Sequence, residues 1–434
     1  MRAPSSRGFT LIELLVAAAV SAIVIGGVFV AVNSQQRAFY DGQRQRAAQT
    51  AVRDALLALE RIVPVAGYGM DAPLALDLDR YAVPAGRCPT QMGTCPRDST
   101  ANADELVVMR RDPAYWTPAA WNAEPAGHAW LIPQGVVTAP TLTAIAVTIN
   151  ARAGDRFAQG QIVQAVCKGG GIYAYFTVSA NTPATGPVAA AGTLAIPLET
   201  AVAADPFHQQ GWATNTQYAS MNICFTNGTA RLFLIERYRF HVRPVASGAG
   251  FTPYLVLDPG KDANFDSNID TADEQVLAEG IENFQVAYVM NNPALLPRGL
   301  TAGTAIGITR SVVSAAPQSA SGLTTLLFPG TAGGTPPASQ SVYAPSSFYP
   351  YSVGPPSDPM RYTDHQANVV AVRIALAARG PDPEPDASTG ELPGPLYNMD
   401  TQPAWIDTST KFARVRVEAT LPLRNTFVRG MNDF

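Results

Sequence analysis

Apolar residues form one unbroken run near the N-terminus and later change to short alternating stretches. Residues 14–32 are nineteen positions without a charged side chain, enough for a helix to cross a hydrocarbon core of about 30 Å. Residues 34–63 keep helical spacing, with charged residues on the other faces. The apolar stripe consists of Val52, Leu56, Leu59 and Val63. Because Pro64 cannot continue a helical hydrogen-bond ladder, we predict one long helix that ends near residue 63.

Beyond the turn at residues 67–69 the spacing changes to period two, which predicts strands. The clearest alternation places Phe284, Val286, Tyr288 and Met290 on one face. Candidate strands are 106–109, 144–149, 161–167, 173–178, 232–242, 254–257, 281–290, 369–378 and 412–423. The predicted fold class is α+β, with a long N-terminal helix packed on an antiparallel β-sheet domain that spans residues 67–434 and carries long loop insertions. Residues 295–362 are rich in Gly, Pro and Ser and predict a long loop.

Composition supports a β-rich, loop-rich chain and excludes several function classes. The sequence is 47% hydrophobic and only 15% charged, with 35 Gly and 36 Pro. The net charge is -4 and no cluster of Lys and Arg occurs, so we expect no nucleic-acid partner. The four histidines are scattered, and neither a nucleophile elbow nor a phosphate-binding glycine loop is found. We therefore expect no enzymatic activity.

The start of the chain has the charge pattern of an exported protein. Arg2 and Arg7 precede the apolar run, and under the positive-inside rule this basic flank stays cytoplasmic while the bulk of the chain lies outside. An ordinary secretory signal has the same pattern. Glu13 argues against an ordinary secretory signal, because a carboxylate at the edge of the apolar run is costly and a simple export signal gains nothing from it.

The segment Gly8-Phe9-Thr10-Leu11-Ile12-Glu13 resembles the type IV prepilin family, whose hallmark is a Gly followed by Phe-Thr-Leu-Ile-Glu and an apolar helix. The resemblance implies a leader of residues 1–8, cut by prepilin peptidase between Gly8 and Phe9, with methylation of the Phe9 amine. It implies a transmembrane and filament-core helix over 9–33 and an amphipathic continuation over 34–66. Glu13 would pair with the terminal amine of a neighbouring subunit and set assembly register, which relieves the cost of a buried carboxylate.

Landmarks along the rest of the chain resemble the PilW-type minor pilins. They are Ala66-Gly67-Tyr68-Gly69, Arg237-Tyr238-Arg239, Glu282 to Val286, Val370 to Ala378 and Leu423-Arg424-Asn425. The resemblance implies a structural subunit that helps to initiate or cap a type IV pilus, with roles in adhesion and twitching motility. Implied partners are other minor and major pilins, prepilin peptidase, the inner-membrane assembly platform and a PilY-type tip adhesin.

The implied location is the inner membrane, crossed once with the N-terminus cytoplasmic, and then the pilus surface. Two alternatives stay open. One is a pseudopilin of a type II secretion system, and the other is a membrane-anchored, calcium-stabilised adhesin or binding protein that never polymerises.

The four cysteines favour disulfides over a zinc site, because their spacing and neighbours do not provide zinc ligands. Cys88 and Cys95 flank a Pro/Gly-containing heptad and are spaced for a local bridge, which leaves Cys167 and Cys224 to pair between strands. Four cysteines permit three connectivities. Four buried thiols in a cytosolic fold are the alternative, whereas disulfides imply an oxidising compartment.

One acidic loop has calcium-ligand spacing. Oxygen-bearing side chains stand at positions 1, 3, 5, 7, 9 and 12 of a twelve-residue loop, as in EF-hand-type loops. They belong to Asp262, Asn264, Asp266, Asn268, Asp270 and Asp273. Ser267 replaces the usual Gly at position 6 and Asp273 replaces the longer Glu. We predict a structural Ca²⁺ ion; the alternative is a solvated turn in which these side chains cap local backbone.

Overall fold

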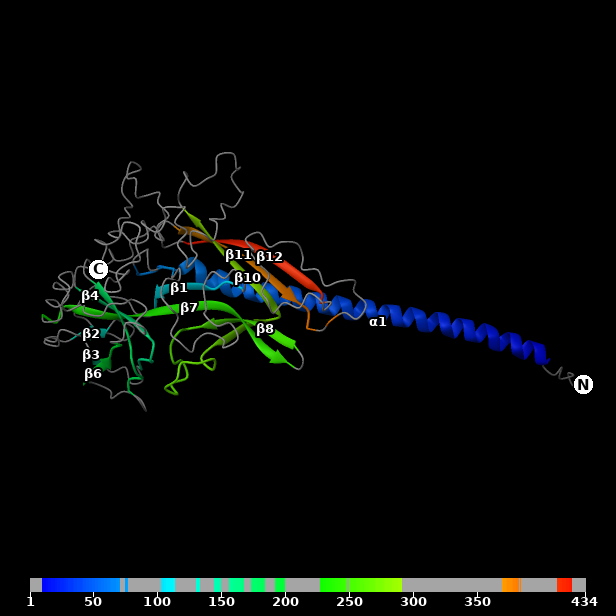
Figure 1. The fold of residues 1–434 in the computed structure, drawn as a ribbon, viewed down its shortest axis with the longest axis horizontal. Helices are drawn as coiled ribbons and strands as arrows, with labels where there is room; N and C mark the ends of the chain where they lie inside the picture. The colour runs from blue at the N-terminus through cyan, green and yellow to red at the C-terminus, as the bar shows by residue number, and fades with distance from the viewer. Residues whose placement is uncertain are drawn as a thin grey trace, which may run out of the picture.

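The computed structural model shows one long helix that runs into a β-rich body (Figure 1). It describes residues 10–70, 75–76, 103–113, 130–132, 144–149, 156–167, 173–183, 192–199, 227–247, 250–290, 369–381, 383 and 412–423. Helix α1 (Leu11–Ile62) has 52 residues and continues into the short 3₁₀ turn η1 (Val63–Val65). The helix therefore ends one residue before the predicted position, where Pro64 enters the turn.

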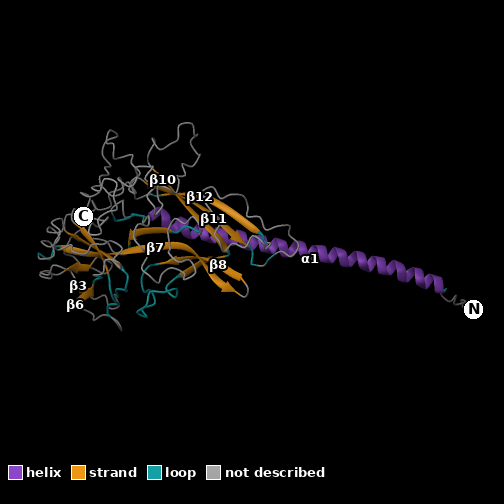
Figure 2. Ribbon diagram, viewed as in Figure 1, coloured by secondary structure: helices purple, strands orange, loops and turns teal. Residues whose placement is uncertain are grey.

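The first half of α1 is exposed and only the second half packs. From residue 11 to 47 no side chain is buried. Ala48, Val52, Ala55 and Leu59 then form a buried stripe with the three- and four-residue spacing of one helix face. Figure 2 shows the exposed half projecting from the body. The predicted division of the helix at residues 33 and 34 stays a prediction, since the first buried position is Ala48.

All strands among the described residues pair antiparallel, and they form two sheets. The larger sheet has nine strands: β1 (Leu106–Arg111), β2 (Trp130–Ile132), β3 (Ala144–Ile149), β4 (Ile162–Cys167), β5 (Tyr173–Thr177), β6 (Gly192–Pro197), β7 (Ala230–Ser247), β8 (Gly250–Asp258) and β9 (Gln275–Glu279). The smaller sheet has the order β10 (Ile281–Met290), β11 (Val369–Arg379), β12 (Arg414–Pro422). The long apolar helix and the antiparallel sheets confirm the α+β expectation.

Strand β7 joins two hydrophobic cores because it is 18 residues long. Phe240 and Val242 lie in a core with the packed half of α1 and with β8, β10, β11 and β12. Ala230 and Leu232, at the other end of β7, lie in a second core with β3, β4, β5 and β6. We call the first group the helix lobe and the second, together with β2, the distal lobe. Figure 1 shows the distal lobe beyond the C-terminal end of α1, opposite the N-terminus.

Several predictions fall outside the described residues. These are the leader with Gly8 and Phe9, the 295–362 loop, and Cys88, Cys95 and Cys224. Three strands were not predicted: β2, β6 and β9. The acidic loop joins β8 to the unpredicted strand β9.

Candidate functional site

The exposed N-terminal half of α1 begins with a closed hydrogen-bond arrangement around Glu13. Thr10 is the N-cap, and its hydroxyl accepts a hydrogen bond from the Glu13 N–H at 3.4 Å. The Glu13 carboxylate in turn accepts bonds from the Thr10 N–H and the Thr10 hydroxyl, both at 3.0 Å. Such a capping box satisfies helix N–H groups that have no partner within the helix. Within the described residues, Glu13 therefore caps its own helix.

The helix that follows is long and apolar enough to cross a membrane, and its apolar window is not buried against any described part of the chain. Leu11, Ile12, Ile23, Ile25 and Phe29 are all more than two-thirds exposed. Leaving these large apolar side chains in water costs about 25 cal/mol for each Å² of apolar surface that stays exposed. The half-helix therefore requires a lipid or protein environment.

Residues 4–29 match the family model of the prokaryotic N-terminal methylation motif. The N-terminus is that of a type IV pilin-like precursor. The match covers the predicted cleavage site at Gly8 and Phe9, the helix cap with Glu13, and most of the exposed apolar run. No curated protein and no solved structure matches the chain.

Side chains of the acidic loop accept hydrogen bonds from the backbone of the same loop. Asp262 is fully buried and Asp273 nearly so. Asp262 accepts hydrogen bonds from the N–H groups of Asp266 at 3.1 Å and Ser267 at 2.7 Å. Ser267 has φ of 73°, the left-handed conformation for which EF-hand-type loops use glycine at this position.

Asp273 closes the other end of the loop. Its carboxylate accepts the N–H groups of Ala263 at 2.7 Å, Asn264 at 3.1 Å and Asp270 at 3.1 Å. The remaining predicted ligands are exposed; they are Asn264, Asp266, Asn268 and Asp270. Among the described residues, no three His, Cys, Asp or Glu side chains are grouped closely enough to hold a metal. The geometry is that of backbone capping, and calcium stays a prediction.

The same loop is fastened to the distal lobe. The Asp262 N–H donates to the carbonyl of Gln159 at 2.9 Å, and the Asn181 side-chain amide donates to the Asp262 carboxylate at 2.5 Å. Asn181 also accepts the Gln159 N–H at 2.8 Å. Asp262 therefore orders both its own loop and the contact between the two lobes.

A small cavity lies beside β7, between the part that pairs with β4 and the part that pairs with β8. It has a volume of about 30 Å³ and is lined in part by Gln161, Glu236 and Lys261. Burial lowers the pKa of Lys261, which donates to the Gln161 side chain at 2.8 Å. A space of this size holds about one water molecule. It does not fit a substrate.

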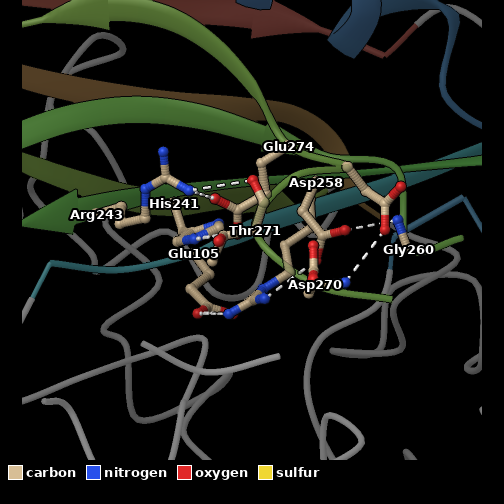
Figure 3. A network of polar contacts seen from close by, with 10 residues as sticks. Glu105, His241, Arg243, Asp258, Gly260, Asp270, Thr271 and Glu274 are labelled. Atoms are coloured by element: carbon tan, nitrogen blue, oxygen red, sulfur yellow. Dashed lines mark hydrogen bonds and ion pairs between the residues drawn. The ribbon is translucent and has the colours of Figure 1, made fainter. Parts of the chain in front are cut away.

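Buried ion pairs connect β7 with its neighbours, and Figure 3 shows this network beside the acidic loop. Arg239 is fully buried between two carboxylates. It donates to Glu105 at 2.5 and 3.0 Å and to Asp258 at 3.2 Å. These carboxylates raise the pKa of Arg239 above its ordinary value, although burial alone would lower it.

A second pair in Figure 3 joins Arg243 to Glu274, the residue after Asp273. His241 lies 3.4 Å from the other oxygen of Glu274. Sequence reasoning identified none of these groups as a network, because ion pairs between residues far apart in the chain leave no spacing signal.

Cys167, at the end of β4, is buried and disulfide-bonded. Since it is the sole cysteine among the described residues, its partner lies outside them. The pairing of Cys167 with Cys224, and that of Cys88 with Cys95, therefore stays a prediction.

Proposed function

We propose that this chain is a minor pilin of a type IV pilus, a structural subunit of the PilW type that helps to initiate or cap the filament and catalyses no reaction. The methylation motif on a long helix with an unburied apolar half carries the proposal. After cleavage, that half would leave the inner membrane and pack among the helices of other subunits. Other minor and major pilins, the assembly platform and a PilY-type tip adhesin are the proposed partners.

The distal lobe supports a terminal position. Its strands lie beyond the C-terminal end of α1, on the side away from the membrane anchor (Figure 1). A subunit stacked above this one in a filament would have to be accommodated around that lobe. A position at the filament end avoids the conflict.

Processing at Gly8 is the first test of this function. We expect mature chain isolated from membranes to begin at Phe9 and to carry one methyl group on its amine, as read by mass spectrometry of the N-terminal peptide. Deleting the prepilin peptidase should leave residues 1–8 attached. Cleavage by the general signal peptidase, or an unmethylated full-length chain in cells that contain the peptidase, would contradict the proposal.

The location of the mature chain separates the proposed function from its alternatives. We expect the chain in purified pili, and loss of surface pili and twitching motility without loss of enzyme secretion in a deletion strain. Loss of secretion with intact pili would support the type II secretion pseudopilin. A mature chain that never enters filaments would support the membrane-anchored adhesin.

Calcium would serve this subunit as a structural ion, because the acidic loop lies between β8 and β9 and contacts the distal lobe through Asp262. We expect chelation to lower the melting temperature of the full chain in detergent, and added Ca²⁺ to restore it. Asp266→Ala is the matched control, since Asp266 is exposed and removing it deletes one predicted ligand. Equal melting temperatures with and without chelator in the unaltered chain would leave the loop as a capped turn.

A further inference from the structure

Two exposed aromatic residues stand in an otherwise polar stretch of α1. Residues 33–47 separate the apolar run from the first buried helix position, and Phe39 and Tyr40 are the large apolar side chains among them. Phe39 is 60% exposed and Tyr40 is 57% exposed. Their rings meet edge to face, with centroids 6.1 Å apart. Exposed aromatic pairs of this kind mark contact surfaces more often than isolated apolar residues do.

The helix lobe of the same chain does not cover Phe39. The buried stripe of α1 begins at Ala48, nine residues after Phe39. At 3.6 residues per turn, nine residues are two and a half turns, so Phe39 lies about 180° from the stripe. The side chain therefore faces away from the body of its own subunit.

The membrane does not reach Phe39 either. Residues 14–32 form a helix about 28 Å long, which fills a hydrocarbon core of about 30 Å. Phe39 lies seven residues beyond Val32, about 10 Å farther along the axis. The headgroup layer on each side is only about 5 to 7 Å thick. Phe39 therefore lies outside the bilayer when the apolar run is centred in it.

Phe39 continues a row of apolar residues that runs along the membrane half of the helix. Every seventh residue is apolar through Leu11, Ala18, Ile25, Val32 and Phe39, and the row ends at Arg46. The members of this row are exposed along the whole helix. A seven-residue apolar repeat is the spacing by which helices pack side by side.

We propose that Phe39, supported by Tyr40, is the residue through which α1 packs outside the bilayer against the N-terminal helix of a neighbouring prepilin-type subunit. The contact extends the helix–helix interface across the polar stretch that follows the membrane span. This proposal rests on the proposed function, because it assigns the neighbour that filament assembly would supply. Burial of one phenylalanine at such a contact corresponds to about tenfold or more in affinity.

Site-specific photocrosslinking in the full chain tests the contact. A benzophenone amino acid would replace Phe39, and in separate variants Gln45 and Val28, in cells that make the filament. Gln45 is the matched control, because it is exposed in the same polar stretch but lies about 120° around the helix from Phe39. We expect position 39 to crosslink to the N-terminal helix of another subunit, identified by mass spectrometry, with at least fivefold higher yield than position 45.

Three outcomes separate failure of this proposal from failure of the proposed function. Crosslinks at position 28 but equal yields at 39 and 45 would overturn the Phe39 contact and keep the filament subunit. Crosslinks from position 39 to lipid alone would place the pair in the membrane and also overturn it. No crosslink to any subunit from position 28 or 39 would contradict the proposed function itself.

A side-chain series checks the same contact without a probe. Phe39→Ser should reduce the amount of chain in purified filaments about tenfold, whereas Phe39→Leu should retain most of it. Both variants should keep the melting temperature of the unaltered chain, because Phe39 is 60% exposed and lies opposite the buried stripe of α1. Normal filament content of Phe39→Ser would contradict the proposal.

Discussion

Replacing Glu105 by alanine is expected to lower the free energy of unfolding by about 3 kcal/mol. Glu105 is buried and binds the fully buried guanidinium of Arg239 through two hydrogen bonds. Without Glu105, Arg239 loses two hydrogen bonds and keeps the 3.2 Å contact with Asp258. The cost of burying a guanidinium is then only partly offset, which is the main reason why breaking a buried pair is destabilising.

Urea unfolding of the full chain in detergent, followed by circular dichroism, measures this change. Glu236→Ala is the matched control, because Glu236 of β7 pairs with Arg110 of β1 at 2.7 Å but both side chains are partly exposed. Partly solvated pairs contribute about 0 to 1 kcal/mol. A loss below 1 kcal/mol for Glu105→Ala, equal to that of the control, would show that the Arg239 network contributes nothing beyond a surface pair.

Spacing along the chain predicted those elements whose faces differ in polarity over many residues. Of the predicted helix stripe, Val52, Leu59 and Val63 are buried as expected. Leu56 is only partly buried against the same core. Strand β10 has the predicted bounds, and Phe284 and Val286 point into the helix-lobe core. These signals are strong because each periodic position contacts one continuous core.

Short elements and buried polar groups gave no comparable signal. β2 has three residues, and β9 has mostly exposed positions, so neither shows a buried face in its sequence. Gln285 lies opposite the apolar face of β10 yet is fully buried. Its amide donates to Asn283 at 2.7 Å, a contact that alternation alone does not predict.

In the candidate site too, some features could be predicted from the sequence and others could not. Glu13 and the apolar run were found because a short local motif carries the chemistry, and residues 4–29 match the methylation motif. The link from Asp262 to Asn181 joins positions 81 residues apart and leaves no trace in spacing. Local motifs are readable from sequence, whereas contacts between lobes depend on how β7 brings distant segments together.

Gly280→Ala is expected to destabilise the chain by about 2 to 5 kcal/mol. Gly280 stands between β9 and β10, where the chain passes from the larger sheet to the smaller one. Its N–H donates to Pro253 of β8 at 2.7 Å, and its carbonyl accepts from Arg379 of β11 at 2.8 Å. One residue is therefore hydrogen-bonded to both sheets.

Two physical terms add at this position. Gly280 has φ of 86°, a left-handed conformation that costs other residues about 1 to 2 kcal/mol. A Cβ atom would also lie 2.7 Å from the carbonyl oxygen of Arg379, which is backbone and cannot move without shifting β11. The overlap adds about 1 to 3 kcal/mol. Alanine would therefore weaken the junction of the two sheets.

Gly42→Ala is the matched control, because the same substitution there has the opposite expected sign. Gly42 lies inside α1, and a Cβ atom would meet nothing within 4 Å. Replacing a glycine within a helix by alanine stabilises it by about 0.5 to 1 kcal/mol. Urea unfolding of both variants in detergent should shift the midpoint down for Gly280→Ala and leave it equal or higher for Gly42→Ala. Equal midpoints for the two variants would mean that neither the left-handed conformation of Gly280 nor its close approach to Arg379 requires glycine there.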